Sequence, residues 1–219
     1  MSYRLAVFDM DGTILDTLQD ITNSINHALE KNGYPVRTIE EVKSFVGNGL
    51  MKLVERAVPP GTSDENKKKV YDDLIPYYLA HGTDNTKPYK GITDLLKKLR
   101  AAGVKCSVVS NKADPAVQNL VLKCFDGMFD MALGEKPGVR KKPDPDMTEN
   151  VLDALGVGKE DAVYIGDSDV DIMTARNSGL DEILVDWGFR SREFLEEHGA
   201  KRIVSSTEEI YKIITEGER

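Results

Sequence analysis

Cysteine is nearly absent from this chain, which has two among its 219 residues. Cys106 and Cys124 lack the spacing of a metal-binding motif, and they cannot form the set of bridges that stabilises many small secreted proteins. We therefore expect two buried or half-buried thiols. Stability must come from a packed core, and hydrophobic residues, at 40% of the chain, are sufficient to build one.

Long apolar runs are also missing. No stretch approaches the ~20 apolar residues that a helix needs to cross a bilayer. The first residues, Met1-Ser2-Tyr3-Arg4, lead directly into a short strand-like segment and do not resemble a signal peptide. We expect a cytoplasmic protein, a monomer or a homodimer, without a membrane partner.

An excess of positive charge is a third absence. Lys and Arg number 29 against 37 Asp and Glu, which gives a formal net charge of −8. This balance argues against nucleic acid as a partner, because the phosphate backbone attracts basic surfaces. A small phosphorylated metabolite remains a suitable partner, provided that a metal, a lysine or an arginine supplies positive charge locally.

The apolar residues that are present predict an α/β fold. Four short runs have the length of buried parallel strands, at 5–8, 106–109, 162–165 and 182–185. Amphipathic, helix-like segments lie between them, at 91–102, 115–124, 146–155 and 169–178. Alternating strands and helices indicate a mostly parallel sheet covered by helices.

One region interrupts this alternation. Between residues 16 and 83 the pattern is helical only, at 17–31, 40–45, 49–58 and 66–81. A helical block inserted after the first strand is typical of a cap. We therefore predict an α/β core domain formed by 1–15 and 84–219, and a helical cap domain formed by 16–83.

Two carboxylates stand at the end of the first predicted strand. Asp9 and Asp11 are two residues apart, and like charges in one site raise one pKa unless a cation intervenes. The arrangement suits a metal-bound nucleophile beside a general acid, and Gly12 permits a tight turn there. A solvated Asp-Gly turn is the alternative interpretation.

A second acidic group follows the run 162–165. Asp167 closes that strand and Asp171 lies about one helical turn further, so that both can face one point. Helix capping is the alternative, and it would account for one acid, Asp169. Several carboxylates from two strand ends form an oxygen-rich site of the kind that Mg²⁺ prefers.

A hydroxyl and a cation complete the set. Ser110 follows the run 106–109, where its hydroxyl and nearby backbone N–H groups can meet phosphate oxygens. Lys142 precedes a predicted helix start. Both residue types are common in turns and on surfaces, and their position after strands favours a functional role.

These motifs occur in a familiar order: Asp9-Met10-Asp11-Gly12-Thr13, Ser110-Asn111, Lys142-Pro143-Asp144-Pro145 and Gly166-Asp167-Ser168-Asp169-Val170-Asp171. Order and spacing over nearly the whole chain resemble the haloacid dehalogenase superfamily. The resemblance implies that Asp9 is the nucleophile and Asp11 the general acid and base. It implies that Thr13 supports the first loop, and that Ser110 and Lys142 hold the phosphoryl group.

The resemblance also implies a Mg²⁺ site and a topology. Asp9 and Asp167 would bind the metal, Asp11 would contribute its backbone carbonyl, and Asp171 would bind directly or through water. The family's Rossmann-like sheet has the strand order 3-2-1-4-5, which places strands 1 and 4 side by side. The two acidic groups would meet there.

Further segments resemble phosphoglycolate phosphatases in particular: Phe45-Val46-Gly47-Asn48-Gly49, Glu55-Arg56-Ala57, Ser110-Asn111-Lys112, Lys141-Lys142-Pro143 and Trp187-Gly188-Phe189-Arg190. They imply substrate contacts by Asn111 and, in the cap, by Asn48, Gly49 and Arg56. Lys52 and Arg56 share one face of the helix at 49–58, and the alternative interpretation is that both are solvated surface charges. An arginine there suits a substrate carboxylate, because it can bind in bidentate fashion.

The sequence thus predicts a Mg²⁺-dependent phosphatase that acts on small phosphate monoesters, phosphoglycolate first, through a phosphoaspartate. A β-phosphoglucomutase-like mutase, a pyrophosphatase and a nucleotidase share most of the motifs. A dehalogenase would need neither Asp11 as acid nor a metal. A phospho-acceptor receiver or an effector-binding domain is the alternative outside enzymes, and the helical insertion argues against a receiver.

Overall fold

The computed structural model describes residues 2–217 and divides them into two compact units. One unit contains the described residues up to Leu15 and those from Pro88 onward, and the other is Asp16–Lys87. The predicted cap, 16–83, falls within the second unit, and its assignment as a domain stays a prediction.

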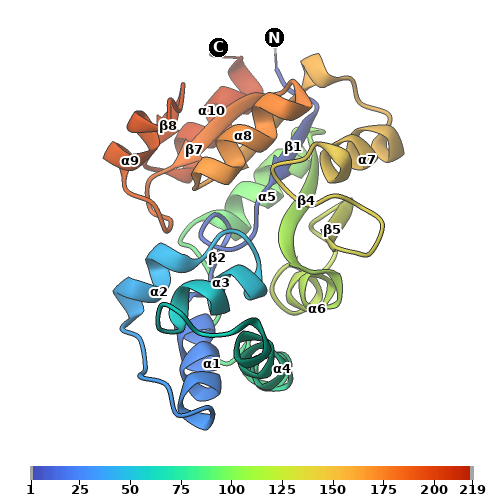
Figure 1. Ribbon diagram of the computed structural model, residues 1–219. Helices are drawn as coiled ribbons and strands as arrows, with labels where there is room; N and C mark the ends of the chain where they lie inside the picture. Colours follow the sequence, from blue (N-terminus) through green and yellow to red (C-terminus); the bar gives the residue numbers. More distant parts are fainter. Residues whose placement is uncertain (1, 218–219) are drawn as a thin grey trace. The chain divides into compact units, whose positions relative to one another are not determined.

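The first unit contains a parallel sheet of six strands (Figure 1). In chain order these are β1 (Leu5–Phe8), β4 (Lys105–Ala113), β5 (Met131–Glu135), β6 (Ala162–Gly166), β7 (Asp181–Val185) and β8 (Ile203–Val204). Their spatial order is β5-β4-β1-β6-β7-β8. The predicted α/β class is confirmed, and the first five strands have the order 3-2-1-4-5. A sixth, β8, extends the edge beyond β7.

Two strands have no counterpart among the apolar runs. β5 is a half-exposed segment, Met-Ala-Leu-Gly-Glu, and β8 has two residues. Neither is apolar and long enough to be recognised without its neighbour in the sheet.

Helices cover both faces of this sheet. They are α5 (Ile92–Ala101), α6 (Asp114–Phe125), α7 (Asp146–Leu155), α8 (Asp169–Ser178), α9 (Arg192–Glu197) and α10 (Thr207–Glu216), with a 3₁₀ turn at Lys159–Asp161. The predicted bounds of α7 and α8 are confirmed. Each ends at a left-handed glycine, Gly156 with φ 63° and Gly179 with φ 71°.

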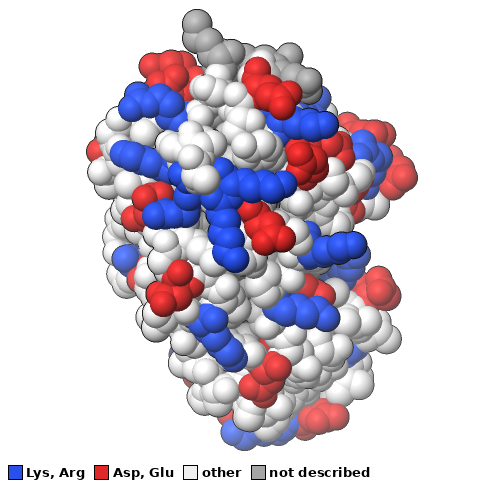
Figure 2. All heavy atoms as spheres, turned by 180° about the vertical axis from the view of Figure 1, so that it is seen from behind, with Lys and Arg blue, Asp and Glu red and all other residues white. Residues whose placement is uncertain are grey.

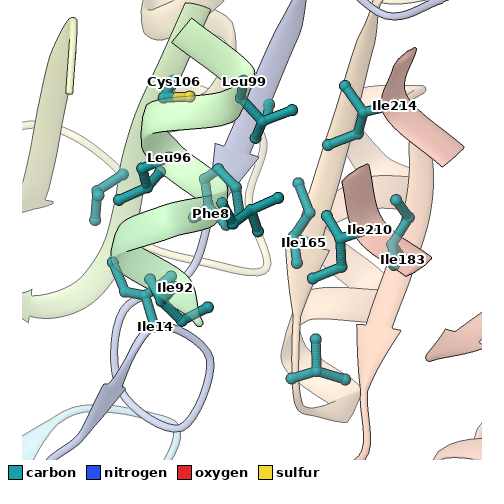
Figure 3. Close-up of a cluster of buried hydrophobic side chains, with 14 of the residues drawn as sticks. Phe8, Ile14, Ile92, Leu96, Leu99, Cys106, Ile165, Ile183, Ile210 and Ile214 are labelled. Carbon is teal, nitrogen blue, oxygen red and sulfur yellow. The ribbon is translucent and has the colours of Figure 1, made fainter. Parts of the chain in front are cut away.

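The core follows the alternation of side chains along β1. Ala6 and Phe8 point to one face, where α5, α6 and α10 pack, and Leu5 and Val7 point to the other, where α7 and α8 pack. Figure 3 shows Phe8 and Ile165 of the sheet among aliphatic side chains of α5 and α10. This apolar packing fixes the strands whose ends carry the polar residues.

The second unit is built from α1 (Leu18–Lys31), α2 (Ile39–Phe45), α3 (Leu50–Ala57) and α4 (Asp64–His81). A capping box of Thr38 and Glu41 begins α2, and Ser63 caps α4. In α1 the buried Asp20 accepts hydrogen bonds from the backbone N–H groups of Asn85 and Thr86, at 2.8–3.0 Å. The start and the end of this unit are thereby tied together.

Two short strands at the joints, β2 (Leu15–Asp16) and β3 (Lys87–Pro88), form a separate sheet.

Basic side chains lie beside acidic ones on the face seen in Figure 2. Surface ion pairs of this kind contribute little to stability. Within residues 2–217, no helix has both the length and the apolar character required to cross a bilayer.

Candidate active site

The carboxyl ends of three neighbouring strands carry the polar residues predicted from the sequence. β1 lies between β4 and β6, with Phe8 paired to Val108 on one side and to Ile165 on the other. Asp9 follows β1 directly, and its N–H donates to the Ile165 carbonyl at 2.8 Å. Ligands of open α/β sheets bind at this edge, where the direction of strand order reverses.

Lys142 is the centre of the polar cluster. The residue is 4% exposed. Its Nζ lies 2.6 Å from Asp9 Oδ1 and 2.8 Å from Asp171 Oδ1, and it donates to the Tyr164 hydroxyl at 3.0 Å. Asn111 Nδ2 donates to the Lys142 carbonyl at 3.0 Å. Burial by itself would lower the pKa of Lys142, but Asp171 and Asp9 outweigh it and hold that pKa well above its usual value.

The carboxylates around Lys142 lack compensating charge. Burial raises the pKa of Asp9 to about 7, against the attraction of Lys142, and repulsion from Asp171 adds to the effect. Burial and the charges of Asp171 and Asp9 also raise the pKa of Asp167 well above its usual value. Ionisation of all three carboxylates beside one ammonium would leave two negative charges in a buried site, and a divalent cation would balance them.

The geometry of the same three acids fits a metal. Asp9, Asp167 and Asp171 each offer an oxygen, and these oxygens lie within 4.8 Å of one another. An all-oxygen, carboxylate-rich donor set suits Mg²⁺. Both the negative charge of these acids and the short distances between their oxygens therefore suit Mg²⁺. The ligand roles, including that of the Asp11 backbone carbonyl, stay predictions.

Asp171 has a second role at the start of α8. Its Oδ2 accepts from the backbone N–H of Asp167 at 3.2 Å, from that of Ser168 at 3.1 Å and from the Ser168 hydroxyl at 2.6 Å. The capping acid is therefore Asp171, and the assignment of this role to Asp169 is wrong. Three donors on one oxygen and Lys142 on the other fix the Asp171 carboxylate firmly.

Thr13 and the segment after β7 hold Asp167. The Thr13 hydroxyl donates to Asp167 Oδ1 at 3.1 Å, and the Phe189 N–H donates to Oδ2 at 2.7 Å. Trp187 Nε1 donates to the Thr13 carbonyl at 3.2 Å, so the same segment also supports the first loop. Sequence reasoning assigned no role to Trp187 or Phe189, although their segment was part of the family resemblance.

Asp11 is paired with a lysine that the sequence argument did not select. Lys112 Nζ lies 2.7 Å from Asp11 Oδ1 and 2.8 Å from Oδ2. The Ser110 hydroxyl accepts from the Lys112 backbone N–H at 3.2 Å. The available signal was position, since Lys112 is two residues after Ser110, near the end of the same strand.

The predicted substrate contacts of the cap lie in the second unit. Arg56 donates to the Phe45 carbonyl at 2.6 Å and to Asn48 Oδ1 at 2.7 Å, and Gly49, with φ 88°, precedes α3. Arg56 thus organises the loop before its own helix. Lys52, on the same helix, pairs with Glu55 at 2.6 Å. The substrate roles of Asn48, Gly49 and Arg56 stay predictions.

Comparison with known families decides the relationship. The model of the haloacid dehalogenase-like hydrolases matches residues 6–185. This chain belongs to the haloacid dehalogenase-like hydrolases. The predicted superfamily is confirmed, and the match includes the carboxyl ends of β1, β4 and β6.

Several relatives of this hydrolase are named as phosphoglycolate phosphatases. It is 32% identical over 199 residues to a phosphoglycolate phosphatase of Psychrobacter arcticus, with 86% of each chain covered. The phosphoglycolate phosphatase of Aquifex aeolicus is 29% identical over 187 residues, which cover 85% of this chain and 86% of the relative.

Solved structures agree with this relationship. A protein from Lactobacillus delbrueckii subsp. bulgaricus, provisionally named a phosphoglycolate phosphatase, has a TM-score of 0.94 and 44% identity, over 98% of this chain and 99% of that one. A predicted phosphatase from Clostridium acetobutylicum has a TM-score of 0.87 and 30% identity, over 99% and 100%.

Proposed function

We propose that this hydrolase is a Mg²⁺-dependent phosphatase that cleaves small phosphate monoesters through a phosphoaspartate on Asp9. The observation that carries the proposal is the buried cluster in which Lys142 bridges Asp9 and Asp171, with Asp167 close to both. A purely structural ion pair would not need a third buried carboxylate without its own cation. Membership of a hydrolase family and relatives named as phosphatases support the same reaction class.

The first half-reaction uses Asp9 and Asp11. An Asp9 carboxylate oxygen attacks phosphorus in line, a bond forms between them, and the bond to the leaving oxygen breaks. Asp11 gives a proton to that oxygen, so that a neutral alcohol departs. Lys142 and the Ser110 hydroxyl hold the phosphoryl oxygens during the transfer. A phosphoaspartate results.

The second half-reaction returns Asp9 to its carboxylate form. Asp11 takes a proton from water, the oxygen of that water attacks phosphorus, and the bond to Asp9 breaks to release inorganic phosphate. Two moderate barriers replace one large barrier. Bound Mg²⁺ would supply positive charge that offsets the repulsion between the carboxylates and the anionic phosphate.

We infer that phosphoglycolate is a preferred substrate. The named relatives support this choice, and a substrate with a carboxylate needs a cation beyond those that hold the phosphate. Arg56 of the cap is the cation that the sequence suggests. A mutase, a pyrophosphatase or a nucleotidase of the same superfamily would use the same Asp9 and Asp11. A monomeric or homodimeric cytoplasmic enzyme is part of the same proposal.

A substrate panel tests the proposal. Release of phosphate from an aryl phosphate, phosphoglycolate, pyrophosphate, nucleoside monophosphates and sugar phosphates is measured with and without Mg²⁺. We expect Mg²⁺-dependent turnover of the aryl phosphate and phosphoglycolate among the best values of kcat/KM. Absence of turnover on every ester would contradict the enzymatic function. A better substrate of another class would contradict phosphoglycolate alone.

Two variants of α3 test the cap residue. Arg56→Ala should lower kcat/KM for phosphoglycolate more than for the aryl phosphate. Lys52→Ala is the control, because it removes a cation from the same helix while Arg56 keeps its contacts. Equal losses on both substrates in Arg56→Ala would show that the residue acts by holding the loop at Phe45 and Asn48.

A further inference from the structure

Lys112 holds both oxygens of the proposed general acid. The residue is 8% exposed, in the last part of β4, and its ammonium lies 2.7 Å and 2.8 Å from the two oxygens of Asp11. The Asp11 side chain is 16% exposed. A sheltered ammonium that contacts both oxygens of one carboxylate binds it more strongly than a surface lysine would.

The backbone under Lys112 leaves little freedom to move. Its N–H donates to the Ser110 hydroxyl at 3.2 Å, and a Cβ added at Gly134 of β5 would lie 2.6 Å from the Lys112 carbonyl oxygen. The two strands therefore pack closely at this point. Lys112 can therefore leave the contact with Asp11 only by a movement of its side chain, which has four rotatable bonds.

This contact conflicts with the reaction proposed for Asp11. To protonate the leaving oxygen, a carboxyl oxygen of Asp11 must come within hydrogen-bond distance of it. In the structure, both oxygens of Asp11 accept from Lys112. A productive complex is therefore favoured when the pair loosens, and a substrate can loosen it by offering Lys112 another anion.

The distances allow a substrate group to take that place. In the proposed reaction the leaving oxygen would lie one hydrogen bond from an Asp11 oxygen, and Lys112 lies one hydrogen bond from each Asp11 oxygen. Lys112 is thus within roughly 6 Å of the leaving oxygen. A carboxylate on the carbon next to that oxygen, as in a glycolate leaving group, spans this gap, whereas a plain alkyl group offers Lys112 nothing.

Lys112 differs from the other lysines near the strand ends in its acidic partner, which is the proposed general acid Asp11. Lys142 is held by Asp9 and Asp171 and serves the phosphoryl group. Lys136 pairs with Asp114 at 3.2 Å, and Lys141 pairs with Glu135 at 3.6 Å, so both are paired with acids that have no proposed role in the reaction.

We propose that Lys112 selects phosphate esters whose leaving group carries a second anionic group, and that binding of this group releases Asp11 for proton transfer. The inference rests on the proposed phosphatase function and adds a selecting residue in the first unit, independent of Arg56. It adds no covalent step to the reaction. A substrate without the second anion leaves Asp11 held.

Kinetics on a matched pair of substrates test the role. Phosphoglycolate and ethyl phosphate have nearly the same shape and differ by the carboxylate. Wild type should prefer phosphoglycolate. Lys112→Met should lower kcat/KM for phosphoglycolate by about 10- to 100-fold, the range expected when a charged hydrogen bond is lost. Turnover of ethyl phosphate should rise, because this substrate cannot loosen the contact with Lys112 in wild type and the variant no longer holds Asp11.

Two further variants separate charge from structure. Lys112→Arg keeps the cation and should keep the preference for phosphoglycolate. Lys136→Met removes a neighbouring lysine outside the site and should change neither substrate. Equal losses on both substrates in Lys112→Met, or a preference that survives intact, would overturn the role of Lys112.

Direct binding keeps the test decisive if a variant is inactive. The non-hydrolysable pair phosphonopropionate and propylphosphonate is titrated calorimetrically, with Mg²⁺ present, into wild type and Lys112→Met. Wild type should bind phosphonopropionate at least about 10-fold more tightly, and Lys112→Met should lose this ratio. An unchanged ratio overturns the inference, whereas wild type that binds with the expected ratio and hydrolyses no ester overturns the phosphatase function alone.

Discussion

At the scale of single residues, the site depends on how its buried charges are balanced. Lys142 is the cation between Asp9 and Asp171, and both contacts are shorter than 3 Å. Its amine also donates to Tyr164, whose hydroxyl lies 3.4 Å from Asp171 Oδ1. Removal of Lys142 would leave two facing carboxylates without a counterion.

Lys142→Met should therefore destabilise the fold. Loss of one partner from a buried ion pair costs about 3–5 kcal/mol, which corresponds to a fall in the thermal midpoint of roughly 10 °C for a chain of this size. Saturating Mg²⁺ should restore part of that loss, because it supplies positive charge to the same acids. Thermal unfolding with and without Mg²⁺ measures both effects.

Lys98→Met is the matched control for this measurement. Lys98 pairs with Glu208 at 3.1 Å, and both side chains are more than half exposed. Its loss should shift the midpoint by little. A shift in Lys142→Met no larger than in Lys98→Met would show that Lys142 is dispensable for the charge balance.

Asp9→Asn should abolish turnover while the protein stays folded. The amide has nearly the same size, so the contacts around β1 are preserved, but it cannot form the acyl phosphate. The rate with an aryl phosphate should fall to the background, and the thermal midpoint should stay close to that of wild type, because Lys142 keeps Asp171 as its counterion. A variant that kept a tenth of the wild-type rate would rule out covalent catalysis by Asp9.

At the scale of elements, the close approach of the loops after β1 and β7 fixes Asp167. Gly12 has φ 87°, and a Cβ added there would overlap the Asp167 carboxylate. Gly188, in the loop after β7, is equally close to Asp167 from another direction. Both loops can reach this carboxylate only because these two positions have no side chain.

Gly12→Ala and Gly103→Ala form a matched pair that tests this packing. Gly103 has φ 79° and no atom within 4 Å of an added Cβ, so both substitutions share the backbone strain and only Gly12→Ala displaces Asp167. We expect about 100-fold or greater loss of kcat and weaker Mg²⁺ binding in Gly12→Ala alone. Similar activity in the two variants would contradict the positioning of Asp167 by this loop.

The β4 strand also holds the more deeply buried of the two thiols. Burial raises the pKa of Cys106 to about 12, and the nearby Asp130 adds to the effect. Burial also raises the pKa of the half-buried Cys124, but by less. A folded pKa above the unfolded value of about 9 means that the neutral thiol stabilises the fold below pH ~9. That stability is lost as pH rises from ~9 to ~12.

Alkylation of the native protein at pH 8 should therefore modify Cys124 first and spare Cys106. Mass spectrometry of peptides from native and denatured samples gives the two rates. In the denatured control the two thiols should react alike. Equal modification in the native protein would show that β4 opens readily, which would contradict its buried position in the sheet.

At the scale of the whole molecule, the metal site should couple activity to stability. Ligation by Asp9, Asp167 and Asp171 would occur only in the folded chain, because these residues come together through the sheet. Chelation with EDTA should remove activity and lower the thermal midpoint, and Mg²⁺ should restore both. At 100 times the dissociation constant, a ligand stabilises a fold by about 2.7 kcal/mol.

Ca²⁺ and one variant provide the controls for this prediction. Ca²⁺ prefers more ligands and longer bonds than Mg²⁺, so it should bind and inhibit. Asp167→Asn should lose the midpoint shift that Mg²⁺ gives wild type. Full activity after exhaustive chelation would contradict the metal site.

The sequence by itself determined the elements whose signals are local. Apolar runs identify four of the six strands, and the apolar pattern that ends at Gly156 and Gly179 sets the bounds of α7 and α8. The acids at the ends of β1 and β6 were also recognisable, because the end of an apolar run is visible without knowledge of its neighbours. The family relationship follows from the same motifs and their order.

Only the tertiary structure decided which residues meet. Lys142 contacts Asp9 across 133 positions, and Lys112 contacts Asp11 across 101. The choice of Asp169 as the capping acid was wrong for a related reason, since spacing alone does not say which of several nearby acids turns toward the N–H groups. Strand order, packing and side-chain direction determine these pairs, because a contact between distant residues depends on the whole fold that brings them together.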